Sequence, residues 1–448
     1  MTQFFIGTIL RLTRLKLALL ITAMLALSGC SGGGFDPGSL LSEKKEPIRG
    51  TRESVVSRTG ALKPDPQLLT EPLIVPASQS NSNWVQAGGN SAHAMGNLAL
   101  SSSIKRVWSV KAGEGSGSDG QLTAQPVTGG GRIYIFDTAG RVSAFSTQNG
   151  GAAWSVSLVP EEEDAEGVVG GGVAYHEGRV YATTPFGELV ALSASNGSVV
   201  WRKKLEVPAQ SAPTINGGRI FIIAVTNEVK ALSLTDGAEV WSHQGVGEKA
   251  SRASSTSAAA SGGSVVVPFT TGEILAFNAA TGLSQWGDAL SGSNTLGASS
   301  VLSDVSARPV ISGGFAYAIG HTGSMAAFRL EDGESEWSLG VSGTEMPWLA
   351  GEYLYTIVQR NTLSAISKRK GRARWNAKLS DTSAWVGPVM GGGILIAASS
   401  SGQLTLVSPE NGQVTRKIDL GEPVYISPII AGGTLYVLTD EATLMAFR

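Results

Sequence analysis

The stretch GRVYATTPFGELVALSASNGSVVW, residues 178–201, contains the pattern that decides the fold. Tyr181 is followed ten residues later by a small residue, Ala191, and after ten more residues by Trp201. The same spacing occurs in five further complete copies, Tyr134/Ala144/Trp154, Phe221/Ala231/Trp241, Val266/Ala276/Trp286, Tyr317/Ala327/Trp337 and Tyr355/Ala365/Trp375. A seventh copy, Ile396/Leu406/Arg416, has lost its Trp, and an eighth, Tyr436/Ala446, reaches Arg448 before a Trp can follow.

Within each copy, short runs that alternate apolar and polar residues are separated by glycine-containing pairs such as Asn196-Gly197. Alternation of this kind predicts β-strands, and a two-residue turn with positive φ favours Gly. Repeats of 38 to 51 residues suit one four-stranded sheet each. The sequence therefore predicts an all-β protein, an eight-bladed β-propeller with four-stranded antiparallel blades. We expect the Trp of each outer strand to pack between neighbouring blades.

The missing eighth Trp has a candidate near the start of the repeats. Trp108 lies 26 residues before Tyr134, a gap of the size that separates each other Trp from the next repeat, and it has no repeat of its own. Pairing of the Trp108 strand with the last repeat would close the ring through an N-terminal strand.

Two segments precede the ring. Residues 1–29 combine basic residues, an apolar stretch and small residues before Cys30, which indicates a secretory signal with a lipoprotein cleavage box and lipidation of Cys30. The alternative is an unpaired thiol in an uncleaved anchor. Residues 30–82 are rich in Gly, Ser, Pro and charge, which predicts a flexible linker before the propeller at 83–448.

Composition excludes several functions. Lys and Arg number 34 against 36 Asp and Glu, so we expect no nucleic-acid binding. Cys30 is the only cysteine, which rules out a disulfide within one chain. The four histidines are far apart in the sequence, and no nucleophile elbow, phosphate loop or calcium loop occurs. The sequence predicts no catalytic residue, no metal site and no cofactor.

The segments between each Trp and the next aromatic position differ in length. Around the ring they measure 26, 27, 20, 25, 31, 18, 21 and 20 residues. The long ones cluster in the first five, and the added residues fall in connectors that emerge on one face. Because loops on a rigid scaffold often carry function, we expect binding residues there, although neutral drift in loop length is the alternative.

The lipoprotein signal, the linker and the eight repeats together resemble the BamB family, lipoproteins of the outer-membrane β-barrel assembly machinery. In that family an Arg in one connector and acidic residues in the next contact the barrel-inserting subunit. The family pattern Leu-Ser-Leu-Arg is matched by Lys249-Ala-Ser251-Arg252, and Leu-Ser-Asp-Val-Asp by Leu302-Ser-Asp304-Val-Ser306. Arg252 and Asp304 are retained, whereas Lys249, Ser251 and Ser306 replace family residues.

The resemblance implies a non-enzymatic scaffold that binds the periplasmic POTRA domains of the barrel-inserting subunit, beside other lipoproteins of the complex. It further implies a place on the periplasmic face of the outer membrane, anchored to lipid through Cys30. Nascent outer-membrane proteins are a further candidate partner. Two alternatives remain. The repeats are similar to those of pyrroloquinoline-quinone dehydrogenases, and exposed strand edges suit a module that binds peptidoglycan or unfolded chains.

Overall fold

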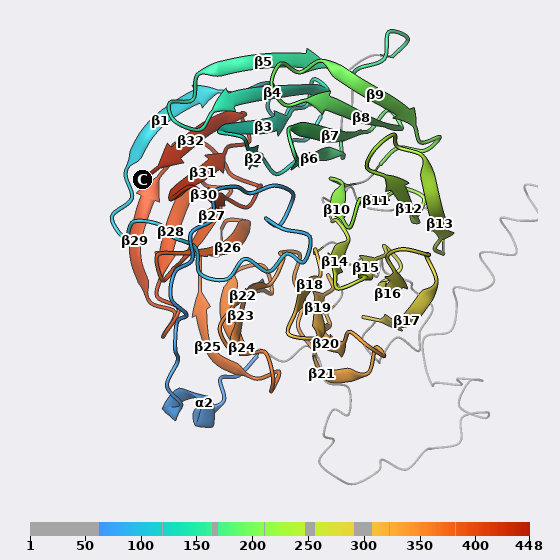
Figure 1. Cartoon of the computed structure of the whole chain (residues 1–448). Coiled ribbons are helices and arrows are strands. Elements are labelled where there is room, and N and C mark those ends of the chain that lie inside the picture. Colours follow the sequence, from blue (N-terminus) through green and yellow to red (C-terminus); the bar gives the residue numbers. More distant parts are fainter. Residues whose placement is uncertain are drawn as a thin grey trace, which may run out of the picture. The chain divides into compact units, whose positions relative to one another are not determined.

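The computed structural model describes residues 62–118, 120–163, 169–209, 211–246, 256–290, 307–321, 323–380 and 382–448. These residues form eight four-stranded antiparallel sheets arranged as the blades of a ring (Figure 1). The predicted eight-bladed β-propeller is therefore confirmed. The single α-helix of the described residues, α2 (Pro66–Thr70), has five residues. None of the helical structure described is long and apolar enough to span a membrane.

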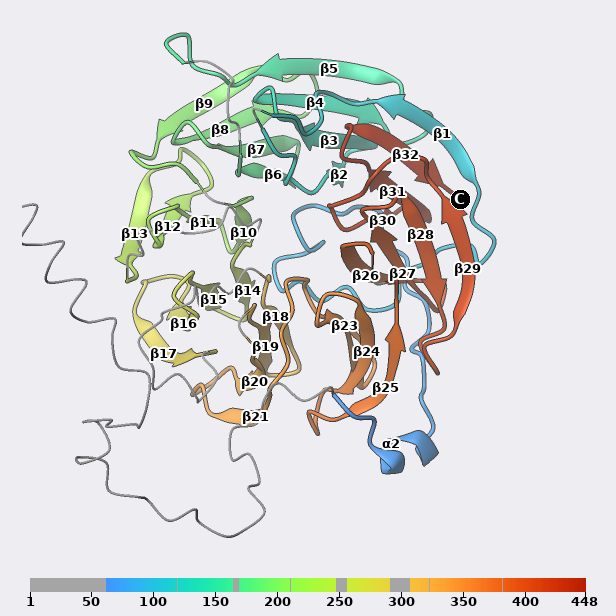
Figure 2. The same ribbon diagram turned by 180° about the vertical axis from the view of Figure 1, so that it is seen from behind.

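The strands follow the chain, and the first strand of each blade lies nearest the axis of the ring (Figures 1 and 2). Blades 1 and 2 comprise β2 (Val127–Gly129), β3 (Arg132–Phe136), β4 (Arg141–Ser146) and β5 (Ala152–Ser157), then β6 (Gly172–His176), β7 (Arg179–Thr184), β8 (Glu188–Ser193) and β9 (Val199–Lys204). Blades 3 and 4 comprise β10 (Thr214–Asn216), β11 (Arg219–Ile223), β12 (Glu228–Ser233) and β13 (Glu239–Gln244), then β14 (Ala259–Ser261), β15 (Ser264–Pro268), β16 (Glu273–Asn278) and β17 (Ser284–Ala289). Blades 5 and 6 comprise β18 (Val310–Ser312), β19 (Phe315–Ile319), β20 (Met325–Arg329) and β21 (Ser335–Leu339), then β22 (Trp348–Ala350), β23 (Tyr353–Val358), β24 (Thr362–Ser367) and β25 (Ala373–Lys378). Blades 7 and 8 comprise β26 (Trp385–Gly391), β27 (Ile394–Ser399), β28 (Gln403–Val407) and β29 (Val414–Asp419), then β30 (Ile429–Ala431), β31 (Thr434–Leu438), β32 (Thr443–Phe447) and, from the start of the chain, β1 (Arg106–Lys111).

The ten-residue spacing of the repeat is the register of the blade. In blade 1, Tyr134 lies opposite Ala144, which lies opposite Trp154 on the outer strand. The equivalent three positions are directly paired in every other blade as well. A small residue between two large rings lets them share one face of the sheet, because cross-strand neighbours lie only about 5 Å apart.

Each outer-strand Trp packs against the next blade, as predicted. The ring of Trp154 covers Gly197, in the turn between β8 and β9, so closely that a Cβ there would lie 2.6 Å from the indole. Gly197 also has φ +76°, which favours glycine on conformational grounds. The Trp154 Nε1 donates to the Ala194 carbonyl at 3.0 Å. This contact therefore joins neighbouring blades by both packing and a hydrogen bond.

The N-terminal strand closes the ring. β1 pairs antiparallel with β32, Trp108 lies opposite Ala446, and the Trp108 ring is 5.8 Å from that of Tyr436. The ring-closing role predicted for Trp108 is confirmed. This eighth blade also explains why the seventh lacks a Trp. The last two strands of blade 8, β32 and β1, come from distant parts of the sequence, so no glycine turn joins them and none needs to be covered by a Trp of blade 7. Arg416, at the Trp position of blade 7, instead donates to the Ile104 carbonyl at 3.1 Å.

Residues 81–98, which we term the crossing segment, run across the ring and bond to all eight blades (Figure 1). Its partners lie in the first strand of each blade or in the turn that follows it. In blade order, the bonds are Thr128 N to Trp84 O, Tyr175 N to Val85 O, Ile215 N to Gln86 Oε1, Ala260 N to Ser91 O, Ile311 N to Ala92 O, Trp348 Nε1 to Gly96 O, Leu98 N to Met390 O and Gly432 N to Asn81 O.

The crossing segment is part of the core. Trp84 is fully buried and stacks on Trp348, with ring centroids 6.1 Å apart and planes 11° from parallel. Gly392 and Gly432, in the first turns of blades 7 and 8, donate to the segment at 2.8 Å each. The segment therefore lies at the end of the axis that carries these turns. The flexible linker predicted from the sequence extends to residue 82, but its described part, 62–82, packs on the propeller.

Candidate functional site

The described ends of the connectors between blades lie at the other end of the ring. Each leaves a blade at its fourth strand and enters the next at its first, and in a four-stranded antiparallel blade these two points share one end. The longer connectors are 112–126, 158–171, 245–258 and 290–309. The shorter ones are 205–213, 340–347, 379–384 and 420–428. The predicted clustering of long connectors on one part of a single face agrees with these strand bounds.

Two of the long connectors serve the same blade. Connector 245–258 enters blade 4 at β14, and connector 290–309 leaves it after β17. Their inner ends touch, since the Thr256 hydroxyl donates to the Ala307 carbonyl at 3.3 Å. Thr214, in the preceding blade, donates to the Ala258 carbonyl at 2.7 Å and fixes the first connector where it joins β14.

The residues predicted to bind a partner belong to these two connectors. Lys249, Ser251 and Arg252 fall in the first, and Asp304 and Ser306 in the second. All five lie outside the described residues, as does Cys30, so their positions remain predictions. The described ends of the connectors are adjacent, which is the arrangement that a shared binding surface requires.

The described histidines do not gather into a site. His93 is buried in the crossing segment, where its Nδ1 donates to the Pro309 carbonyl at 2.7 Å and burial lowers its pKa to about 3. His243 lies on the outer strand β13 with its ring 4.7 Å from that of Phe277. Within the part of the chain that the structure describes, no three His, Cys, Asp or Glu side chains are grouped to hold a metal ion.

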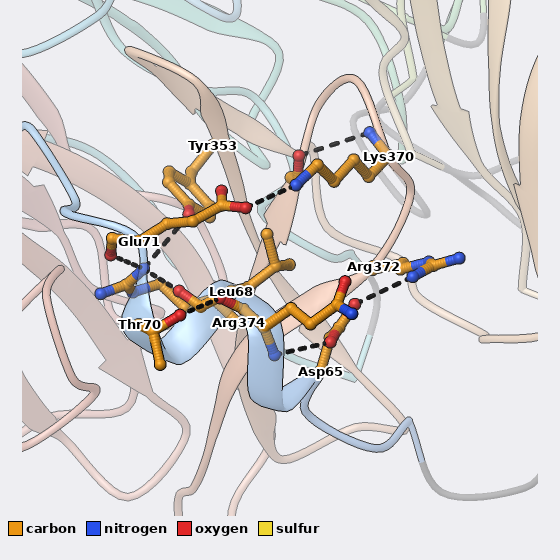
Figure 3. Close-up of polar contacts among 10 residues, drawn as sticks. Asp65, Leu68, Thr70, Glu71, Tyr353, Lys370, Arg372 and Arg374 are labelled. Carbon is orange, nitrogen blue, oxygen red and sulfur yellow. Dashed lines mark hydrogen bonds and ion pairs between the residues drawn. The ribbon is translucent and has the colours of Figure 1, made fainter.

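Residues 64–71, which we term the docked segment, lie against blade 6 and are missing from the sequence-based predictions (Figure 3). Pro64 forms a parallel bridge to Ala373, and the Asp65 amide donates to the Ala373 carbonyl at 2.8 Å. These residues therefore add to the outer edge of β25. The burial of Ala373 and Trp375 is consistent with this cover, whereas the outer strand of blade 1, for example, keeps alternate residues exposed.

Charged side chains hold this docked segment in place. Arg374 donates to the carbonyls of Leu68 and Glu71, and its guanidinium lies 5.8 Å from the centre of the Tyr353 ring (Figure 3). Asp65 caps α2 and pairs with Arg372 at 3.1 Å, and hydrogen bonds to the Gln67 amide and to Arg372 lower its pKa. A signal was present in the sequence, because Asp65 followed by Pro66 is a typical helix start.

The sequence was compared with known families and proteins. The model of the family described as "Outer membrane protein assembly factor BamB" matches residues 138–377 and 359–448. An outer membrane protein assembly factor BamB of Nitrosomonas eutropha is 22% identical over 239 residues, which cover 53% of this chain and 56% of that protein. An uncharacterized protein of Rickettsia prowazekii is 25% identical over 167 residues, 37% of this chain and 40% of that protein. These alignments therefore span only about half the length of the relatives.

Solved structures share the fold. BamB of Moraxella catarrhalis superposes with a TM-score of 0.63 at 17% identity, covering 78% of this chain and 98% of that one. A europium-containing methanol dehydrogenase superposes with a TM-score of 0.67 at 13% identity, covering 85% and 99%. At such identities the likeness extends to the propeller architecture and not to a shared activity.

Proposed function

Because the chain belongs to the family of the outer membrane protein assembly factor BamB, we propose that it is a non-enzymatic scaffold of the outer-membrane β-barrel assembly complex. In this proposal the connector end of the ring binds the periplasmic POTRA domains of the barrel-inserting subunit. The observation that carries it is the contact of connectors 245–258 and 290–309 through Thr256 and Ala307. The propeller acts as a rigid frame that presents two adjacent loops.

Arg252 and Asp304 are the proposed centre of this surface. A guanidinium can donate two parallel hydrogen bonds to a carboxylate or to backbone carbonyls of the partner. Asp304 either accepts from the partner or holds Arg252 in position. Exposed charge pairs contribute only about 0–1 kcal/mol, so these residues set orientation and register. Lys249, Ser251 and Ser306 are their neighbours in the sequence and replace the two leucines and the second Asp of the family pattern.

Lipidation of Cys30 would hold the protein at the periplasmic face of the outer membrane, with residues 31–61 between the lipid and the docked segment. Other lipoproteins of the complex would then be its neighbours. Nascent outer-membrane proteins are the further candidate partner. Metabolic labelling with a palmitate analogue tests the anchor. Label that persists in a Cys30→Ala variant would contradict it.

The test of the scaffold proposal is binding of the purified full-length protein to the POTRA domains of the barrel-inserting subunit from the same organism. We expect Arg252→Glu and Asp304→Arg each to weaken binding at least tenfold. Arg369→Glu is the matched control, because Arg369 is an exposed arginine in the turn between β24 and β25, at the opposite end of the ring. Equal loss in the control, or no loss in the connector variants, would contradict the proposed surface.

The non-enzymatic part of the proposal has a separate test. Quinone dehydrogenases of similar fold stack their cofactor beneath a disulfide of adjacent cysteines, which a chain whose only cysteine is Cys30 cannot form. We expect the purified protein to show no quinone absorbance and no dye-linked alcohol oxidation after addition of pyrroloquinoline quinone and calcium. Turnover under those conditions would overturn this part and leave the binding result to be judged separately.

A further inference from the structure

A polar cavity of about 60 Å³ lies at the connector end of the ring axis. Its lining comes from four points where the chain enters a new blade. Gln125 precedes β2, Arg308 precedes β18, Glu345 precedes β22, and Tyr425 and Ser427 precede β30. Tyr425 is 45% exposed, so the cavity is reached from the side on which the connectors lie.

The crossing segment bonds to residues at this cavity. The Gln125 side-chain oxygen Oε1 accepts from the Gly88 backbone amide at 2.9 Å, and the Gln125 side-chain Nε2 donates to the Ser427 backbone carbonyl at 3.0 Å. His93 of the same segment bonds to the carbonyl of Pro309, next to Arg308. Gln125 and the residue next to Arg308 are therefore both held by a segment that is bonded to all eight blades.

Arg308 is the side chain that points to a ligand. It is only partly exposed, and its Nε is shielded from solvent without a hydrogen-bond partner in the described structure. Burial lowers its pKa to about 10, which still leaves it charged at neutral pH. A shielded guanidinium nitrogen without an acceptor is costly, because its lost hydration is not replaced. An anion in the cavity would supply the acceptor.

Glu345 does not satisfy that need. Its Oε2 accepts from the Gly387 amide and from the Ser427 hydroxyl at 3.2 Å each, and it forms no ion pair with Arg308. Burial raises the pKa of Glu345 to about 7, so that near neutral pH the carboxyl is partly protonated. Arg308 is the charged group that faces it, and Tyr425 is the other titratable side chain of the lining. The cavity is then positive overall.

We propose that this cavity is a carboxylate-binding site, in which the Arg308 guanidinium binds the carboxylate. A carboxylate fits the planar fork of a guanidinium through two parallel hydrogen bonds. The ligand is either a small free carboxylate or the side chain of a Glu or Asp on a polypeptide bound at the connector end. The proposal does not depend on which partner the connectors bind.

The first experiment follows the melting temperature of the full-length protein at pH 6.5 as sodium acetate replaces sodium chloride at constant ionic strength. We expect a saturable rise with a midpoint in the millimolar range. Methylammonium chloride is the matched cation and should have no effect. No rise with acetate, or an equal rise with methylammonium, would overturn the proposal.

Two variants locate the site. Arg308→Gln should weaken acetate binding at least tenfold, and Arg308→Lys should give an intermediate loss because it keeps the charge without the fork. Glu345→Gln should keep acetate binding and remove its dependence on pH, which in the wild type is expected to be several-fold tighter at pH 6 than at pH 8. Acetate binding that is unchanged in a folded Arg308→Gln variant would refute the assignment.

A peptide separates the two sources of carboxylate. N-acetyl-Gly-Gly-Glu-Gly-Gly-amide carries one carboxylate and no other charge, and the same peptide with Gln is its control. Binding of the Glu peptide at least as tight as that of acetate, and lost in Arg308→Gln, indicates a polypeptide side chain as the ligand. Binding of acetate alone indicates a small molecule, and binding of neither contradicts the site.

Discussion

The two ends of the ring axis are built differently. At one end, residues 81–98 bond to all eight blades and bury Trp84 completely. At the other, connectors of unequal length surround a polar cavity that contains the unpaired Nε of Arg308. The first end is tied to every blade by hydrogen bonds, which favours stability, although Asn81 Oδ1, Trp84 Nε1 and His93 Nε2 are buried there without a partner. The second end differs in charge, because its unpartnered nitrogen belongs to a charged guanidinium beside a cavity, and such a group is more often kept for binding than for folding.

The strongest test of this contrast removes the closed end. Deleting residues 62–104 while keeping β1 should destabilise the propeller by on the order of 5 kcal/mol or more, since it exposes Trp348 and leaves inner-strand donors without acceptors. Urea unfolding followed by tryptophan fluorescence measures the change. A variant of unchanged stability would show that the crossing segment is only a cover.

A single substitution sharpens the same point. Trp84→Ala should cost about 3–5 kcal/mol, the range for truncation of a fully buried Trp. Leu69→Ala, at a residue of α2 that is 55% exposed, is the control and should change stability by less than about 0.5 kcal/mol. Comparable midpoints for both variants in urea would count against a core role for the crossing segment.

The open end should respond to pH. The folded-state pKa of Glu345 lies near 7, above its ordinary value of 4.5, so the folded protein binds the proton more tightly than the unfolded chain. Stability from this group is therefore fully present below about pH 4.5 and is lost as the pH rises through 7. Glu345→Gln should equal the wild type at pH 4.5 and exceed it by about 1–2 kcal/mol at pH 8.5, allowing for solvent screening. Thermal unfolding across this range measures the difference, and parallel curves would contradict the raised pKa.

The smallest effect on stability is expected at the mouth of the cavity. Tyr425 is 45% exposed, so Tyr425→Ala should change the free energy of unfolding by about 0.5 kcal/mol or less. The variant should nevertheless alter binding of the Glu-containing peptide, because its ring lines the cavity. A large loss of stability with unchanged peptide binding would reverse the assignment of roles to the two ends.

The ring could be predicted from the sequence, whereas the crossing segment at its closed end could not. The ten-residue spacing is visible because a register between neighbouring strands repeats at a fixed interval, and Trp108 could be assigned by elimination. The crossing segment has no such period, because its contacts with successive blades are made mostly by backbone groups at irregular intervals. The role of Arg308 could not be predicted from the sequence either, because the lack of a partner for its Nε depends on where distant connectors meet. Arg252 and Asp304 came from family resemblance and remain to be tested.

Closure of the ring by β1 and β32 constrains the order in which the protein can fold. Arg106 pairs with Phe447, so the last blade cannot form until residue 447 has been synthesised. Until then, β1 lacks its partner strand and the crossing segment lacks the eighth blade. Contacts between such distant residues form slowly and leave strand edges open to aggregation. We therefore expect a nascent chain in which β1 is unpaired to depend on chaperones until β32 is available.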